Sequence, residues 1–102
     1  MITYLKGRLA FKDPTHLVVD VGGVGYEVKI SLITYSQVKD KEDILIQTYM
    51  HVKEDSHTLF GFYENSEKKR FLDLLSINGV GPSTALMILS SLDAKELQAA
   101  IV

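Results

Sequence analysis

Residues 17–30 have the sequence LVVDVGGVGYEVKI, which predicts two strands joined through glycines. Gly22, Gly23 and Gly25 suit a tight turn or a sharply coiled strand, because glycine tolerates positive φ. On both sides of the glycines, apolar side chains recur at every second position, as in strands that bury one face. These positions are Leu17, Val19 and Val21, followed by Tyr26, Val28 and Ile30.

Strand patterns also occur at residues 5–11, 44–52 and 59–62, whereas residues 31–38 are ambiguous and are interpreted as a single helical turn. Asp13-Pro14 is a turn signal between the first two strands. Five short strands with one helical interruption predict a closed or nearly closed barrel, and the OB-fold is a five-stranded barrel that binds nucleic acid. A fragment of a β-sandwich is the alternative that strand count leaves open.

The hydrophobic period changes after Tyr63 from that of a strand to that of a helix. Asn65 or Ser66 is expected to cap this helix, with Glu67 in its first turn, where a negative charge complements the helix dipole. Its apolar stripe has spacings of three and four. The stripe consists of Phe71, Leu72, Leu74 and Leu75.

Residues 78–81 break this helix, and Pro82 is expected to open the next one, because proline is favoured at the first helical position. Asp93-Ala94-Lys95-Glu96 resembles a capping box and predicts a third helix that continues to the end of the sequence. The fold class is therefore α+β. We expect residues 1–63 to form a five-stranded barrel of the OB-fold type, and residues 64–102 to form an all-α helix-hairpin-helix segment that is a truncated part of a helical domain.

Composition narrows the classes of function. The 102 residues contain no Cys, which excludes a disulfide scaffold, a thiolate zinc site and a cysteine nucleophile. The net charge is −2, with seven Lys and Arg against eight Asp and Glu in residues 1–63 and four against five in residues 64–102. Binding of nucleic acid by a bulk positive field is therefore not expected. No apolar stretch suits a membrane span or secretion signal, and we expect a cytoplasmic protein without a membrane partner.

The segment INGVGPSTA at residues 77–85 lies between the two amphipathic helices and is the sharpest local motif. Two glycines at spacing two allow a tight turn whose successive N–H groups can bind an anion. The start of the next helix adds unpaired amides and its positive dipole end. The alternative is an ordinary turn between helices, in which the glycines only end a helix. We expect a sequence-independent phosphate site. Its residues are Asn78, Gly79, Val80, Gly81, Ser83 and Thr84.

Three motifs in this order and spacing make the chain resemble the RuvA family, the junction-recognising subunits of the bacterial RuvAB branch-migration machine. They are GGVGYEV at residues 22–28, LFGF at 59–62 and NGVGP at 78–82. Family members often carry Lys directly after NGVGP, where this chain has Ser83. That departure removes a phosphate ion pair and bears on affinity and its salt dependence.

The resemblance implies a role in DNA recombination, repair and the SOS response. The barrel would form a homotetramer, with an octamer on DNA as the other assembly, and the helical hairpins would hold a four-way Holliday junction open and square. The RuvB motor, which hydrolyses ATP, and the RuvC junction nuclease are the implied partners. The chain itself is expected to be a non-catalytic subunit with no cofactor and no metal. Ser83 has no neighbouring His or Asp, and the glycine loops match neither a Walker motif nor the dinucleotide fingerprint.

Glu54 and Asp55 lie between the fourth and fifth predicted strands. The resemblance implies that this pair forms an acidic pin near the junction crossover. Repulsion of phosphates would keep duplex DNA from crossing the centre. A solvated turn is one alternative. The other is a metal site that adds His51 and His57 to the pair.

Lys53, Lys68 and Lys69 are candidate contacts to the DNA backbone, although a cationic run such as residues 68–70 is usually a solvated helix face. A single-strand-binding OB module is the alternative function, and it requires exposed aromatic platforms. An oligomerisation or protein-docking module without DNA contact is a third class. The candidate platforms are Tyr4, Tyr26, Tyr49 and Phe60.

Overall fold

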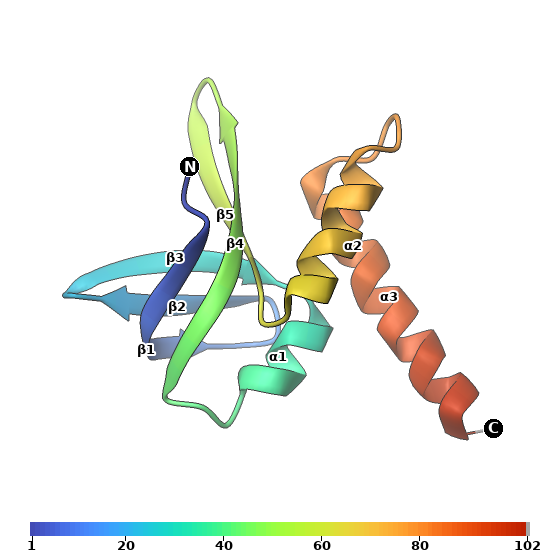
Figure 1. Ribbon diagram of the computed structural model, residues 1–102, viewed down its shortest axis with the longest axis horizontal. Coiled ribbons are helices and arrows are strands. Elements are labelled where there is room, and N and C mark those ends of the chain that lie inside the picture. Colours follow the sequence, from blue (N-terminus) through green and yellow to red (C-terminus); the bar gives the residue numbers. More distant parts are fainter. Residues whose placement is uncertain (102) are drawn as a thin grey trace.

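The structure is a computed structural model that describes the backbone of residues 1–101 and the side chains of residues 1–91 (Figure 1). Five strands precede a pair of longer helices, and one short helix interrupts the strands. In chain order the elements are β1 (Tyr4–Lys12), β2 (His16–Val21), β3 (Val24–Ile30), α1 (Leu32–Val38), β4 (Asp43–Lys53), β5 (Ser56–Phe62), α2 (Asn65–Leu75) and α3 (Pro82–Ile101).

The strands close into a barrel with the order β1-β2-β3-β5-β4. Neighbouring strands are antiparallel except β3 and β5, which pair in parallel through Val28↔Leu59 and Ile30↔Gly61. The short helix α1 connects β3 to β4, where the sequence predicts a helical turn. Closure excludes the sandwich alternative, and the five-stranded barrel is consistent with the predicted OB-fold.

The predicted alternation places one face of each strand inside the barrel. The buried residues of this interior are Leu5, Leu17, Val19, Val28, Ile30, Val38, Ile44 and Ile46. At the β2–β3 turn, Gly22 and Gly23 have φ of 61° and 94°. Two successive positive φ values suit a two-residue hairpin loop, which explains why glycine occupies both positions. Gly25, by contrast, has no positive φ.

The last residues of β5, Phe60 to Phe62, are buried on both faces of the strand. Gly61 faces the barrel interior, where an added Cβ would meet the Val28 side chain at 2.4 Å. Phe60 and Phe62 face the other way and form a second apolar cluster with Phe71 of α2. The Phe62 and Phe71 ring centroids are 4.8 Å apart. This second cluster joins the helices to the barrel.

α2 and α3 lie side by side and run in opposite directions (Figure 1). α3 contributes Ala85 and Leu89 to the cluster around Phe71. No helix among the described residues is long and apolar enough to cross a membrane.

Two expectations for the helices are wrong. α2 has its N-cap at Glu64, not at Asn65 or Ser66, and the Glu64 side chain makes no capping hydrogen bond. The backbone of α3 continues without a break through residues 93–96, where a third helix was expected to begin. The side chains of that capping-box motif lie outside the described residues.

Candidate nucleic-acid interface

The turn between α2 and α3 is held in shape by its own backbone. Gly79 has φ of 87°, in the left-handed region that favours glycine. The Val80 N–H donates to the Ile77 carbonyl at 3.1 Å, and the Ala85 N–H donates to the Gly81 carbonyl at 2.9 Å. The second bond begins α3 directly after Gly81, which confirms Pro82 at the first helical position.

This geometry leaves a short series of amides without protein acceptors. Within residues 1–91, neither the Gly79 nor the Gly81 N–H donates to a protein atom. Ser83 and Thr84 lie in the first turn of α3, where N–H groups have no partner within the helix. The Val80 amide is occupied by the turn. The free donors are therefore grouped at one exposed tip, in an arrangement that can bind an anion.

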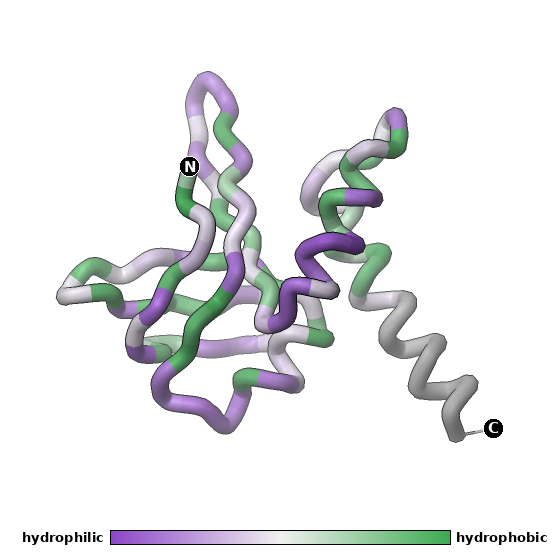
Figure 2. Tube along the Cα trace, viewed as in Figure 1, coloured by the Kyte–Doolittle hydropathy of each residue, from purple (hydrophilic) through white to green (hydrophobic). Residues whose placement is uncertain are grey.

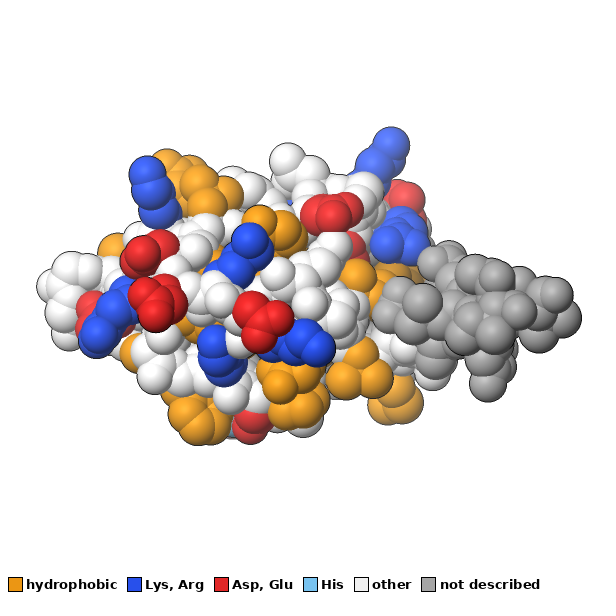
Figure 3. Space-filling model, turned by 90° about the horizontal axis from the view of Figure 1, so that it is seen from below, with side chains coloured by type: hydrophobic (Ala, Val, Ile, Leu, Met, Phe, Trp, Pro, Cys, Tyr) orange, Lys and Arg blue, Asp and Glu red, His pale blue; other side chains and the backbone are white. Residues whose placement is uncertain are grey.

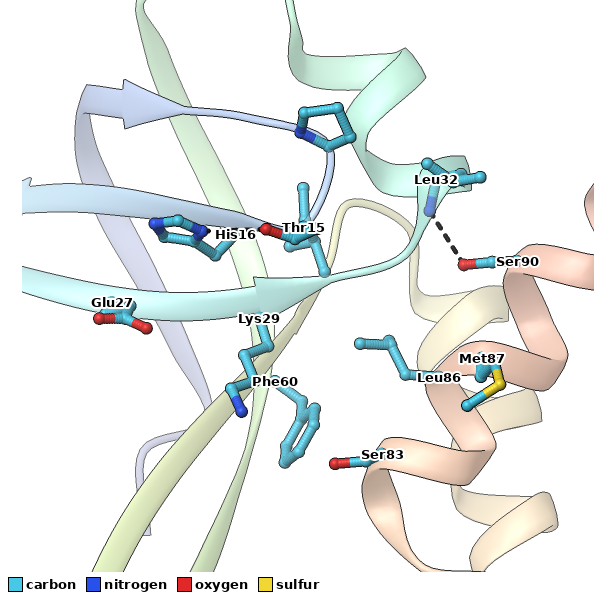
Figure 4. Close-up of a pocket in the computed structure, with 12 residues that line it drawn as sticks. Thr15, His16, Glu27, Lys29, Leu32, Phe60, Ser83, Leu86, Met87 and Ser90 are labelled. Carbon is cyan, nitrogen blue, oxygen red and sulfur yellow. Dashed lines mark hydrogen bonds between the residues drawn. The ribbon is translucent and has the colours of Figure 1, made fainter.

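Ser83 and Thr84 are both exposed at this tip, but only Ser83 lines a groove of about 490 Å³ between α3 and the barrel (Figure 4). Lys29 and Glu27 of β3 lie on the barrel side of the groove, and Leu86 and Met87 lie on the helical side. At its far end, the Leu32 N–H donates to Ser90 Oγ at 3.1 Å.

Asp13, close to the groove residues Thr15 and His16, organises the β1–β2 loop. Its Oδ1 accepts hydrogen bonds from Thr15 Oγ1 at 2.7 Å, Thr15 N at 2.7 Å and His16 N at 2.9 Å. The Thr15 side-chain hydrogen bond, followed by the backbone bonds from Thr15 and His16, lowers the pKa of the Asp13 carboxyl below its usual value.

Glu54 and Asp55 form the tip of the β4–β5 hairpin, which projects beyond the barrel (Figure 1). Both are exposed, as is Val52 below them. Figure 2 shows the tip as strongly hydrophilic. In Figure 1, this tip and the α2–α3 turn project from the same side of the molecule.

The β4–β5 register bears on the metal alternative. Val52 pairs with His57, and His51 pairs with Thr58. Paired residues share a face and successive residues alternate, so His51 and His57 project from opposite faces. Within residues 1–91, no three His, Asp or Glu side chains are grouped as metal ligands.

The candidate cations are dispersed. Lys53 ends β4 beside the acidic pair, whereas Lys68 and Lys69 lie on α2, where Lys68 is half-buried and Lys69 exposed. Figure 3 shows the side opposite to the α2–α3 turn and the β4–β5 tip, and there basic and acidic side chains are interspersed.

The aromatic platforms required by the single-strand alternative are not assembled. Phe60 is buried, and the Tyr49 ring lies 5.6 Å from Phe71. Tyr26 packs against the barrel interior. Of the four candidates, Tyr4 alone is largely exposed, at 56%.

Sequence reasoning missed the role of Glu67. Glu67 lies in the first turn of α2, as expected, but its side chain is buried and accepts hydrogen bonds from Ser31 and Thr34 of the α1 region. Lys29 was also missed as a groove residue. The one sign in the sequence was Ser31, a hydroxyl residue at the start of α1. Its partner Glu67 lies 36 residues later, so the sequence pattern did not connect the two.

Comparison with known proteins identifies related chains. Residues 1–61 match the family described as the RuvA N terminal domain. Curated relatives named Holliday junction branch migration complex subunit RuvA align along nearly the whole chain. The protein from Cytophaga hutchinsonii is 56% identical over 99% of this chain and 51% of its own length. The Amoebophilus asiaticus protein is 52% identical over 100% of this chain and 53% of its own length. The Pseudomonas putida protein is 46% identical over 95% of this chain and 48% of its own length.

The chain therefore spans about half the length of these relatives. The family match covers more than half of the chain, and identities near one half extend through β5, α2 and the turn at Gly79. These matches agree with the closed barrel and with the motifs at residues 22–28, 59–62 and 78–82. The chain belongs to the RuvA family.

Proposed function

We propose that the chain binds four-way DNA junctions, without sequence specificity and as a homotetramer, and holds them open for branch migration. The observation that carries the proposal is the exposed α2–α3 turn, where the free N–H groups of Gly79 and Gly81 lie next to the start of α3. This choice of DNA is supported by the relatives, which are named as subunits of a Holliday junction branch migration complex.

In this proposal the α2–α3 pair acts as a helix-hairpin-helix that binds phosphates. Amides of Gly79, Gly81, Ser83 and Thr84 donate to phosphate oxygens, and the two hydroxyls add further donors. Asn78 and Val80 shape the tip. None of these groups reads a base edge, so binding is independent of sequence.

Ser83 gives this site no cation. Fewer counterions are released on binding than with a lysine at this position, so a weaker salt dependence is expected. Lys53, Lys68 and Lys69 are proposed as additional backbone contacts. Affinity then comes mainly from simultaneous engagement of several hairpins in one assembly, since linked sites gain through their effective concentration.

Glu54 and Asp55 are proposed as the acidic pin. A four-fold assembly brings copies of this tip around one axis, where negative charge repels phosphates and steers separated strands past the centre. The tip projects from the same side as the α2–α3 turn, as this role requires (Figure 1). The chain is proposed as a non-catalytic cytoplasmic subunit, with RuvB supplying the ATPase and RuvC the junction nuclease.

Two glycine variants test the phosphate site. An added Cβ meets nothing within 4 Å at either Gly79 or Gly81, but only Gly79 has a positive φ. Gly81→Ala should leave thermal stability unchanged while weakening junction binding about tenfold, because the methyl group keeps a phosphate from the backbone. Gly79→Ala should weaken binding and also lower stability, because alanine is strained in the left-handed region.

Light scattering at low salt measures both mass and binding. The expected result is a mass of four chains that increases with a synthetic four-way junction and not with linear duplex. Unchanged junction binding by Gly81→Ala would contradict the phosphate site. Preference for single-stranded DNA would support the OB-module alternative instead.

A further inference from the structure

A buried carboxylate ties the helical hairpin to the barrel. Glu67 of α2 is 1% exposed. It accepts hydrogen bonds from Ser31 Oγ and, at 2.6 Å, from Thr34 Oγ1. These two donors are also buried. Burial of a carboxylate is costly unless hydrogen bonds compensate it, and bonds to a charged acceptor are stronger than neutral ones.

The direction of these bonds is fixed by the backbone. The Thr34 N–H donates to Ser31 Oγ at 3.2 Å and so caps α1. The Tyr63 N–H, directly after β5, donates to Thr34 Oγ1 at 3.2 Å. A backbone N–H can only donate, so each hydroxyl accepts there and retains its single proton for Glu67. Three elements, α1, β5 and α2, therefore meet at one carboxylate.

Apolar contacts alone do not fix the orientation of α2 as tightly. Phe71, one turn after Glu67, packs against Phe62, but hydrophobic burial is non-directional. Hydrogen bonds require alignment as well as proximity. Glu67 and Phe71 lie on the same face of α2, so the carboxylate fixes the rotation of the helix while the phenyl ring supplies burial.

We propose that Glu67 is a positioning residue that sets the direction in which the α2–α3 hairpin leaves the barrel. The far end of α2 lies about 14 Å along the helix axis from Glu67, and the turn at Gly79 follows directly after it. A tilt of about 20° at Glu67 would move the turn by about 5 Å. The spacing between the phosphate-binding turn and the acidic hairpin at Glu54 thus depends on this carboxylate.

The consequence for DNA rests on the proposed function, but the structural claim is measurable without DNA. The chain has no cysteine, so two introduced thiols accept spin labels specifically. Val24→Cys labels an exposed position at the start of β3, and Asp73→Cys labels an exposed position on α2. Dilution with unlabelled chain restricts pulsed electron paramagnetic resonance to distances within one chain.

Thr34→Val removes the hydroxyl and nearly preserves shape, whereas Thr34→Ser keeps the hydroxyl and serves as the conservative rescue. Ser36→Ala is the matched control, because Ser36 is exposed on α1 and, among the described residues, its hydroxyl donates to the Ile33 carbonyl of its own helix. Thr34→Val should broaden or shift the distance distribution and reduce junction affinity about tenfold, since the hairpins then engage together less well. Thr34→Ser and Ser36→Ala should match the parent chain in both measurements.

A Thr34→Val distribution with the parent mean and width would overturn the inference, even if junction binding fell. Equal broadening by Thr34→Ser would also overturn it, because the lost methyl and not the hydroxyl would then be responsible. If circular dichroism shows that Thr34→Val is unfolded, the same spin-label distances are measured in Glu67→Gln. A distribution with the parent mean and width in that variant would then overturn the inference. Failure of the parent chain to bind any junction would contradict the proposed function and leave the distance test valid.

Discussion

Asp13 makes a testable contribution to stability through its charge. Its carboxylate accepts three hydrogen bonds in the β1–β2 loop, and they lower its pKa in the folded state. A group with a depressed folded pKa stabilises the fold at pH values above its unfolded pKa. This contribution is lost as pH falls through the folded pKa. Asp13→Asn should therefore lower the melting temperature at neutral pH.

The difference between Asp13→Asn and the parent chain should shrink as the pH is lowered through the folded pKa of Asp13, because the parent carboxyl then becomes protonated. Thermal unfolding followed by circular dichroism measures it. Asp40→Asn, at an exposed position in the α1–β4 connection, is the control for loss of one negative charge. A melting-temperature difference that stays constant with pH would show that the charge of Asp13 does not stabilise the loop.

At the same scale, Glu67 marks a limit of sequence-based prediction. An acidic residue in the first turn of a helix has a sufficient local explanation in the helix dipole. Its actual partners, Ser31 and Thr34, lie 36 and 33 residues earlier in the chain. Local pattern contains no information about such a contact. Gly22 and Gly23 are the opposite case, because their turn depends only on neighbouring residues, and the sequence predicts it.

Among the elements, strands with one buried face were predicted well, and β5 was not. Its apolar pattern begins at Leu59, but pairing with β4 extends the strand back to Ser56. Alternation also does not reveal that Gly61 faces the barrel while Phe60 and Phe62 face the helices, because both faces are buried. The continuity of α3 across Asp93 was missed because a capping motif is only a local preference.

Gly61 tests the assignment of the two faces of β5. An added Cβ would lie 2.4 Å from Val28 Cγ1 and 2.9 Å from Ile46 Cδ1, so Gly61→Ala overpacks the barrel. The expected loss in the free energy of unfolding is about 1–3 kcal/mol, measured by urea denaturation. Gly25→Ala, whose Cβ would meet only Val18 Cγ1 at 3.2 Å, should cost less. Equal stability of Gly61→Ala and the parent chain would contradict the inward direction of this face.

At the scale of the whole molecule, the change of period after Tyr63 predicted where the barrel ends and the helices begin. It did not predict that both share an apolar cluster around Phe71. That cluster and Glu67 hold the acidic hairpin and the α2–α3 turn so that both project from one side (Figure 1). Under the proposed function, the free amides of this face are expected to attract DNA at its edge, and the exposed carboxylates are expected to repel it near Glu54 and Asp55.

This opposition yields a prediction for the assembled protein. Glu54→Gln combined with Asp55→Asn removes charge from the tip without altering its size, and both side chains are exposed. Junction affinity should rise several-fold at low salt, and the gain should decline as salt screens the repulsion. Titration of a labelled four-way junction at several salt concentrations measures both effects.

The matched control is Asp40→Asn combined with Glu42→Gln, which makes the same change in net charge at exposed positions between α1 and β4. A general effect of net charge would strengthen binding equally in both double variants, because the long-range field depends on total charge. If local repulsion at the tip opposes binding, only the variant that neutralises Glu54 and Asp55 should bind more strongly. The reason is that salt screening limits the reach of each charge to about 10 Å at moderate salt. Equal gains in the two variants would therefore reduce the acidic pair to an ordinary solvated turn.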